Sequence, residues 1–318
     1  MKNEIKSKSR VVVIGGGTGA FTVLSGLRKY SLDLAAVVSM ADDGGSAGVL
    51  REEFGILPPG DVRRVLVAMA HSNDRMLSEL FNYRFAEGGL KGHAFGNIML
   101  TALTRLTGSF ENAIYETSRI LRVRGMVIPV TLDNVRLCAK LENGAVIRGE
   151  TNIDIPKHDG RLRIKKLWLD PRARLNKKAR EAILAANMVV IGPGDLYTSI
   201  LPNLVVGGMR EAIQKSKARK VYVANIMTKW GETNGFRVAD FVRVVENNLG
   251  PGALNYVLIN SKHPSPDRLR QYEKESAEFV VAGDLSRKPV AVFGNFLRRR
   301  GFVRHDPEKL AKVLVSLL

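Results

Sequence analysis

The sequence predicts an α/β fold, with a Rossmann-like three-layer core, a mainly parallel sheet and a β-rich insertion. Three observations predict this class. Strand and helix patterns alternate through most of the 318 residues, as in sheets whose parallel strands are joined by helices. An apolar run at residues 11–14 leads directly into a glycine-rich turn. Residues 135–149 alternate apolar and polar side chains around an Asn-Gly turn, which is typical of a β-hairpin.

The first predicted unit is a strand at residues 11–14, a glycine turn and a helix at residues 21–30. The turn fits the pattern G-x-G-x-x-(G/A), in which glycines allow a tight bend and a close approach to a phosphate. The helix N-terminus adds unpaired N–H groups and a partial positive charge. We therefore expect a phosphorylated ligand, and a nucleotide in particular. The expected contacts in this turn are Gly15, Gly16, Gly17, Thr18 and Gly19.

The second predicted strand covers residues 32–40 and leads through another glycine loop to a helix at residues 49–54. The candidate ligand residues in this loop are Asp42, Asp43, Gly44 and Ser46. One carboxylate can accept a hydrogen bond from a ribose or hold a metal ion, while the hydroxyl and nearby N–H groups contact phosphate. The alternative is a turn that only caps the helix, since Asp and Ser favour that position.

Four further helices are expected, at residues 62–70, 76–85, 97–106 and 111–121. Asp61 is placed to cap the first of them. Arg63 opposes the dipole of that helix, so it requires an anion or a carboxylate as its partner. His93 and Asn97 follow in a loop between glycines and at the next helix start. There His93 acts as an acid–base group, donates to a phosphate, or only satisfies local carbonyl groups.

Three more strands and two helices complete the predicted core. They cover residues 188–191, 220–226 and 256–260 for the strands, and 205–216 and 307–318 for the helices. Two of these strands run into polar loops, and strand-end loops of a parallel sheet converge on one crevice. The candidate ligand residues in these loops are Gly192, Gly194, Tyr197, Thr198, Ser199, Asn225 and Thr228.

Residues 131–170 are predicted to form the β-rich insertion, inside a single nucleotide-binding α/β domain that spans residues 1–318. The insertion carries part of a basic segment, residues 157–180, which holds ten Lys and Arg but only two Asp. The function of this segment is left open by the sequence.

The composition narrows the classes of function. Cys138 is the only cysteine, which excludes a disulfide framework within the chain and a cysteine-based zinc site. We expect no membrane span and no signal peptide, and hence a cytoplasmic protein. The net charge of +18 is compatible with an acidic partner. Because no nucleic-acid-binding motif is present, we do not expect specific nucleic-acid binding.

Six motifs, taken together and in this order, resemble one family. They are GGGTG at residues 15–19, ADDGGSAG at 41–48, PPGDVR at 58–63, KGHAFGN at 91–97, GPGDLYTSILPN at 192–203 and NIMTKWGET at 225–233. The chain resembles the YvcK-type gluconeogenesis factors, in the CofD-like superfamily that also includes phospholactate transferase.

The resemblance implies a Rossmann-like core whose ligands are UDP-sugars or NAD-type dinucleotides. It also implies a cytoplasmic role in cell morphogenesis and wall synthesis on gluconeogenic carbon sources, with an unidentified protein partner. We expect a homo-oligomer. Catalysis is not established for this branch, so we favour a binding protein over an enzyme. The alternative is a Mg²⁺-dependent phosphotransferase in which Asp42 or Asp43 holds the metal.

Three positions depart from the family pattern. Ala47 stands where a second serine is common, which removes one hydroxyl. Asp195 replaces a usual serine, and its charge either weakens phosphate contact or holds a sugar hydroxyl. Lys229 and Trp230 replace a usual Gln-Pro pair, so we expect this loop to have a different shape.

Overall fold

A seven-stranded sheet forms the centre of the computed structural model, which describes residues 8–71, 75–285 and 288–318. Its strand order is β10-β9-β8-β7-β1-β2-β3, and all of its pairings are parallel. The strands are β1 (Arg10–Gly15), β2 (Asp33–Val38), β3 (Met126–Pro129), β7 (Met188–Ile191), β8 (Arg219–Val223), β9 (Tyr256–Asn260) and β10 (Val290–Gly294). The predicted α/β class is therefore confirmed.

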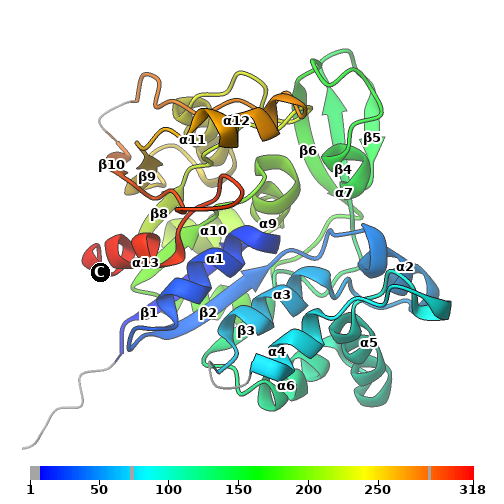
Figure 1. The fold of residues 1–318 in the computed structure, drawn as a ribbon. Coiled ribbons are helices and arrows are strands. Elements are labelled where there is room, and N and C mark those ends of the chain that lie inside the picture. Colours follow the sequence, from blue (N-terminus) through cyan, green and yellow to red (C-terminus); the bar gives the residue numbers. More distant parts are fainter. Residues whose placement is uncertain (1–7, 72–74, 286–287) are drawn as a thin grey trace, which may run out of the picture.

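Helices cover both faces of this sheet, which gives three layers (Figure 1). One face packs against α1 (Gly17–Leu27), α3 (Gly60–Met69), α4 (Arg75–Asn82), α5 (Phe95–Thr107), α6 (Phe110–Ile120) and α13 (Pro307–Ser316). The other face packs against α8 (Lys177–Ala185), α9 (Leu201–Leu204), α10 (Met209–Lys215) and α11 (Val238–Leu249). Helices α2 (Gly45–Phe54) and α12 (Pro266–Glu273) lie outside these sets, and α7 (Glu150–Asp154) belongs to the insertion.

The apolar run in β1 explains why two cores form. Successive side chains of a strand point to opposite faces. Val11 and Val13 accordingly belong to the core beneath α1 and α3, whereas Val12 and Ile14 belong to the core on the other face. All four are buried, as expected for a parallel strand covered on both sides.

The chain changes direction across the sheet between β1 and β7. From β1 it moves through β2 to β3 on one side, and from β7 through β8 and β9 to β10 on the other. In sheets of this kind, ligands bind at the carboxyl ends of the strands that flank such a switch point. The turn at residues 15–19 follows β1 and the loop at 192–199 follows β7, so the two glycine loops are neighbours.

The predicted β-rich insertion is present as a separate three-stranded antiparallel sheet, ordered β5-β4-β6. It consists of β4 (Arg136–Leu141), β5 (Val146–Arg148), α7 (Glu150–Asp154) and β6 (Ile164–Asp170). Gly144 has a φ of 90° in the turn between β4 and β5, a conformation that glycine adopts without strain. The sheet stands at the top right of Figure 1, beside the carboxyl ends of the main strands.

Several element predictions need correction. The predicted helix at 205–216 begins only at Met209, as α10, because Gly208 at its N-cap has a φ of 95° and residues 205–208 are not helical. The predicted strand at 220–226 ends at Val223, so Asn225 and its neighbours lie in a loop. Several described elements were not predicted, among them β3, β10, α7, α8, α9, α11 and α12.

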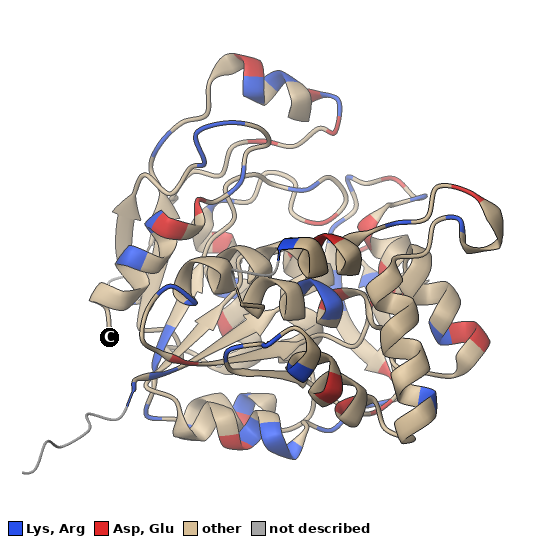
Figure 2. Ribbon diagram, turned by 60° about the horizontal axis from the view of Figure 1, so that its bottom comes forward, with Lys and Arg blue, Asp and Glu red and all other residues tan. Residues whose placement is uncertain are grey.

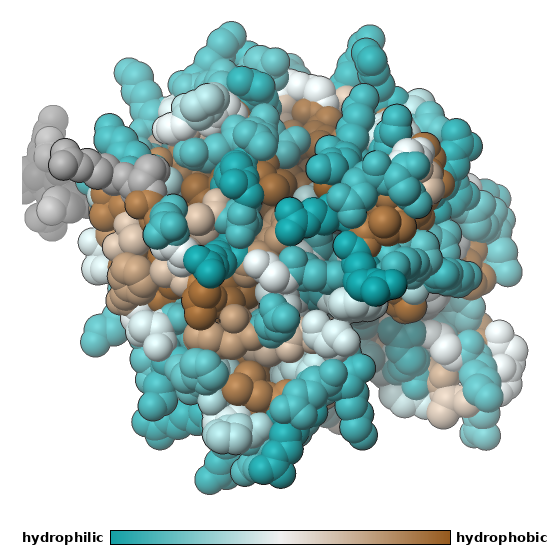
Figure 3. Space-filling view, turned by 90° about the horizontal axis from the view of Figure 1, so that it is seen from above, coloured by the Kyte–Doolittle hydropathy of each residue, from teal (hydrophilic) through white to brown (hydrophobic). Residues whose placement is uncertain are grey.

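Charged and apolar side chains are spread over the surface. Figure 2 shows Lys and Arg distributed over the outer helices and loops, interspersed with Asp and Glu. On the face seen in Figure 3, hydrophilic side chains surround smaller hydrophobic patches. Among the described helices, none has both the length and the apolar character that a membrane crossing requires.

Candidate functional site

A cleft of about 1020 Å³ lies at the carboxyl ends of the central strands. Its walls come from the turn after β1, the loops after β2, β7 and β8, the insertion helix α7, and residues 303–305. Fourteen of the twenty predicted ligand residues line it: Gly17, Thr18, Gly19, Asp42, Gly44, Ser46, Asp61, Arg63, Asn97, Gly194, Thr198, Ser199, Asn225 and Thr228. The cleft thus brings together loops that are far apart in the sequence.

Six predicted residues do not line this cleft, namely Gly15, Gly16, Asp43, His93, Gly192 and Tyr197. The aromatic ring of Tyr197 belongs to a hydrophobic core, and burial raises the pKa of its hydroxyl to about 12. Only its backbone N–H takes part in the polar network around the cleft, by donating to Glu232 Oε2 at 3.0 Å. Tyr197 is therefore a packing residue, which corrects the sequence-based expectation.

The glycines of the first turn have different roles from those predicted. The left-handed residue is Gly17, with a φ of +54°, so the tight bend lies there. A Cβ on Gly16 would lie 2.3 Å from Asp61 Oδ2. A Cβ on Gly19 would lie 1.7 Å from the carbonyl oxygen of Pro193, in the loop after β7. Two of these glycines thus make room for neighbouring protein groups.

The carboxylate of Asp61 lies against this turn and accepts a hydrogen bond from the N–H of Gly17. It does not cap its own helix as predicted, because α3 begins at Gly60, with Pro59 at the N-cap and no side-chain cap. Burial, and then the charge of Asp42, raise the pKa of Asp61 to about 7. The first-turn amides of Thr18 and Gly19 remain the groups that can face an anion.

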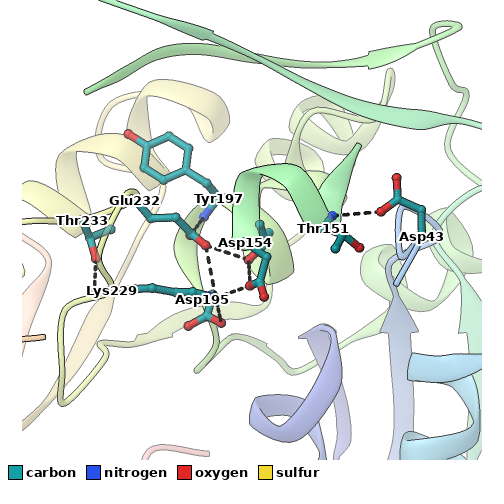
Figure 4. A network of polar contacts seen from close by, with 9 residues as sticks. Asp43, Thr151, Asp154, Asp195, Tyr197, Lys229, Glu232 and Thr233 are labelled. Carbon is teal, nitrogen blue, oxygen red and sulfur yellow. Dashed lines mark hydrogen bonds and ion pairs between the residues drawn. The ribbon is translucent and has the colours of Figure 1, made fainter. Parts of the chain in front are cut away.

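The two adjacent aspartates of the second loop point in different directions. Asp42 lines the cleft; its Oδ1 accepts from Gly44 N at 3.0 Å, and burial raises its pKa. Asp43 instead accepts from Glu150 N at 3.1 Å and Thr151 N at 2.9 Å, at the start of α7 (Figure 4). Asp43 therefore holds the insertion helix, which corrects its expected role as a ligand or metal residue.

The oxygen atoms of Asp42 and Asp61 fit the preference of Mg²⁺ for carboxylate ligands. Both side chains line the cleft, and the charge of Asp42 is felt at Asp61. Glu150, on the first turn of α7, extends this acidic wall. Burial first, and then the charge of Asp42, raise the pKa of Glu150 to about 9.

Ser46 connects two other predicted residues. Its Oγ accepts from Asn97 Nδ2 at 3.1 Å and lies 3.2 Å from His93 Nδ1. His93 is thus within reach of Ser46 but outside the cleft lining, while Asn97 is buried and lines it. Ser46 is therefore held in place by this network.

Arginines form a second, positively charged wall. Arg63 is only 5% exposed, and its Nη1 donates to Asn82 Oδ1 at 3.2 Å. Burial, and then the charges of Arg64 and Arg84, lower the pKa of Arg63 to about 10. Because all three arginines line the cleft, an anionic group of a ligand would relieve their mutual repulsion.

Lys229 joins the loops after β7 and β8 to the insertion (Figure 4). Its Nζ lies 3.0 Å from Asp195 Oδ2 and 3.5 Å from Glu232 Oε1, and it also bonds Asp154 on α7. Burial by itself would lower the pKa of Lys229, but the surrounding carboxylates raise it above its ordinary value. Thr198 Oγ1 donates to Glu232 Oε1 at 3.0 Å, which brings a predicted residue into the same network.

Sequence reasoning missed several residues around the cleft. Glu150 and Asp154 are four residues apart on α7, the spacing that places two side chains on one helix face. Lys229 stands out in the sequence only as a departure from the family pattern, although its charge beside the predicted Thr228 could have indicated that it belongs to the site. His305, in contrast, follows no predicted strand, and only the folded chain brings it to the cleft.

Five residues that line the cleft have a buried polar atom without a hydrogen-bond partner among the described residues. These atoms are Arg63 Nε, Asn97 Oδ1, Thr151 Oγ1, Asn225 Oδ1 and His305 Nε2. Such atoms are rare in protein interiors, where buried polar groups are normally bonded. Their concentration around one cleft indicates a place for a polar ligand.

Comparison with known proteins gives a consistent result. The family model described as "2-phospho-L-lactate transferase CofD" matches residues 11–295. A gluconeogenesis factor of Listeria monocytogenes is 41% identical, over 100% of this chain and 98% of its own length. That of Halalkalibacterium halodurans is 40% identical, over 97% of this chain and 96% of its own length. A crystal structure of a UPF0052 family member from Bacillus halodurans has a TM-score of 0.90 at 38% identity, covering 99% of each chain.

Proposed function

The chain belongs to the CofD family, and from this premise we propose that it is a cytoplasmic nucleotide-binding gluconeogenesis factor. Its ligand is a UDP-sugar or an NAD-type dinucleotide. Through a protein partner, the bound state supports cell morphogenesis and wall synthesis during growth on gluconeogenic carbon sources. Relatives at 40% identity or above carry the name gluconeogenesis factor, which supports the part of this proposal that concerns gluconeogenic growth.

The cleft at the β1–β7 switch point carries the molecular part of the proposal. It is large enough for a dinucleotide, since ligand pockets commonly measure about 300–1000 Å³. Its lining combines glycine loops, cations, carboxylates and unpartnered amides, a mixture that suits a ligand with phosphates and sugar hydroxyls.

Each wall has a role in this binding mode. The amides of Thr18 and Gly19 and the side chain of Arg64 take the phosphates. Asp42 accepts hydrogen bonds from a hydroxyl of the sugar beyond the phosphates, which is the hexose of a UDP-sugar or the second ribose of a dinucleotide. Thr198 and Ser199, in the loop after β7, face the remaining part of the ligand.

Calorimetric titration with UDP-GlcNAc and with NAD tests the proposal. We expect saturable binding of at least one of them, and a loss of about tenfold in affinity for Arg64→Ala, because a charged hydrogen bond to phosphate is removed. Arg105→Ala, on the outside of α5 and not in the cleft lining, is the matched control and should bind like the parent protein. Absence of binding for both nucleotides would overturn the proposal.

A Mg²⁺-dependent phosphotransferase is the second candidate, because of the family model and the paired carboxylates of Asp42 and Asp61. These two residues would hold the metal, which when bound neutralises phosphate charge and orients the phosphoryl group. The arginine wall would then bind the second anionic substrate. Turnover of a nucleotide-activated substrate in the presence of Mg²⁺ would establish this candidate, and silence across a broad substrate panel would favour the binding protein.

A further inference from the structure

One end of the cleft, beyond β8, is apolar. Ile226, Met227 and Val303 are buried there with Leu297, in a small hydrophobic cluster separate from the two main cores. Ile226, Met227, Val303 and the partly buried Tyr272 also line the cleft. The Tyr272 ring is held in place, because its hydroxyl accepts from Val303 N at 2.9 Å. A flat ring of a ligand would therefore find apolar contacts on a rigid wall.

Two unpartnered polar atoms lie at the same end. His305 is only 7% exposed; one ring nitrogen bonds the carbonyl of Ala224, and Nε2 has no partner among the described residues. Oδ1 of Asn225, the residue after Ala224, is also buried and unpartnered. Burial lowers the pKa of His305 to about 4, so at neutral pH the imidazole is uncharged. The nitrogen that bonds a carbonyl carries the proton, which leaves Nε2 as an acceptor.

The apolar end is separated from the phosphate-binding part of the cleft. The amides of Thr18 and Gly19, proposed above to take the phosphates, follow β1, whereas Asn225 follows β8, and β7 lies between these strands. The neutral His305 offers no charge to a phosphate, and the two charged residues nearby have opposite signs: Glu275, which would oppose a phosphate, and Arg304, whose guanidinium lies over the Phe302 ring. An uncharged ring with polar edges suits this end better than an anion does.

We propose that Asn225, Ile226, Tyr272, Val303 and His305, called here the ring pocket, bind the base of the nucleotide ligand, with His305 Nε2 accepting an N–H of the base. This inference rests on the nucleotide-binding function proposed above. The acceptor selects heterocycles that present an N–H donor at the edge, such as N3–H of uracil or the amino group of adenine. The side-chain amide of Asn225 bonds a neighbouring edge atom.

Ligand analogues test the inference without altering the protein. We propose titrating UDP against its N3-methyl analogue, and ADP against the diphosphate of purine riboside, which lacks the amino group. For whichever parent nucleotide binds more tightly, removal of the donor should cost about tenfold in affinity, because a buried acceptor is left unpaired. Analogues that bind within about twofold of their parents would overturn the ring pocket, although the nucleotide-binding function would stand.

A matched pair of variants adds a second test. His305→Phe keeps an aromatic ring but removes the acceptor, so the preference for the more tightly binding parent nucleotide over its donor-free analogue should disappear. Affinity for ribose 5-diphosphate, which has no base, should stay within about twofold. His263→Phe is the control: His263 packs against Phe279 outside the cleft lining and should leave the preference intact. Thermal unfolding of both variants verifies folding; a folded His305→Phe that keeps the preference would overturn the inference.

Discussion

Lys229 Nζ lies 3.0 Å from Asp195 Oδ2 across the cleft wall. Both residues stand where the family pattern recognised in the sequence has neutral side chains, a glutamine and a serine. The structure shows that the two departures meet in one ion pair (Figure 4). Because Lys229 is also shared with Asp154 and Glu232, this pairing offsets the charge of Asp195 only in part.

A double-mutant cycle should reveal this coupling. Lys229→Gln removes the cation beside Glu232, whose side chain is fully buried, and should lower the free energy of unfolding by about 3 kcal/mol. Asp195→Ser alone should cost less than about 1 kcal/mol, since Asp195 is partly exposed. Combined with Lys229→Gln, it should recover stability because one repelling carboxylate is gone. Urea unfolding gives the free energy of unfolding of all four proteins. If the changes in this free energy for the two single variants add up to the change for the double variant, the pair is not coupled.

Two glycines of the first turn should respond differently to substitution. Gly19→Ala places a Cβ 1.7 Å from the Pro193 carbonyl oxygen and should lower the free energy of unfolding by about 3 kcal/mol. Gly15→Ala meets only Ala20 Cβ at 3.8 Å and Gly192 Cα at 4.0 Å, so the change should be under about 1 kcal/mol. Gly89→Ala, with nothing within 4 Å, is the control. Thermal denaturation measures the stability of each variant. If Gly15→Ala and Gly19→Ala lower the free energy of unfolding equally, the packing explanation is contradicted.

Asp61→Asn should distinguish the two candidate functions. The amide oxygen can still accept from Gly17 N–H, but the negative charge beside the helix N-terminus is lost. If the cleft binds phosphates without a metal, affinity for UDP-GlcNAc or NAD at about pH 8 should rise roughly three- to tenfold. If Mg²⁺ is required, affinity should fall and its Mg²⁺ dependence should weaken. Calorimetric titration of Asp61→Asn with and without Mg²⁺ shows whether its nucleotide affinity rises or falls.

Glu150 should make stability depend on pH. Its pKa is about 9 in the folded protein, against an ordinary value of 4.5, so the native state keeps a proton that the unfolded chain releases. Stability should therefore fall as pH rises between these two values. Glu150→Gln should be more stable than the parent protein at about pH 8, with the difference vanishing near about pH 4.5. Urea-unfolding midpoints measured across this pH range give the stability of the parent protein and of Glu150→Gln. Glu53→Gln, on the exposed side of α2, is the control. If the stabilities of the parent protein and of Glu150→Gln change in parallel with pH, Glu150 does not have this role.

Much of the fold follows from the sequence, because buried parallel strands are continuous apolar runs. Strands β7 and β9 have the bounds predicted for them. The edge strand β10 is harder to predict, since Val290 and Phe293 are exposed and neither alternation nor a buried run stands out. Helix α11 could have been predicted, because Val238, Phe241 and Val245 recur on one helix face.

The loops around the cleft could be predicted, but not the direction of each side chain. Asp42 and Asp43 are adjacent and chemically alike, yet one faces the cleft and the other caps α7. No periodicity governs a loop, so this choice depends on the insertion that packs above it. Asp154 and His305 were missed for a related reason: they reach the cleft only through tertiary structure.

The cleft walls run from Gly17 in the first helix, through α7 of the insertion, to His305 just before α13. A small molecule lodged there would fasten three distant stretches of polypeptide to one another, and its binding energy would add to the resistance of the whole chain to unfolding. Proteases in a cell act on opened chains. The supply of that ligand would then influence how long each copy of the protein survives.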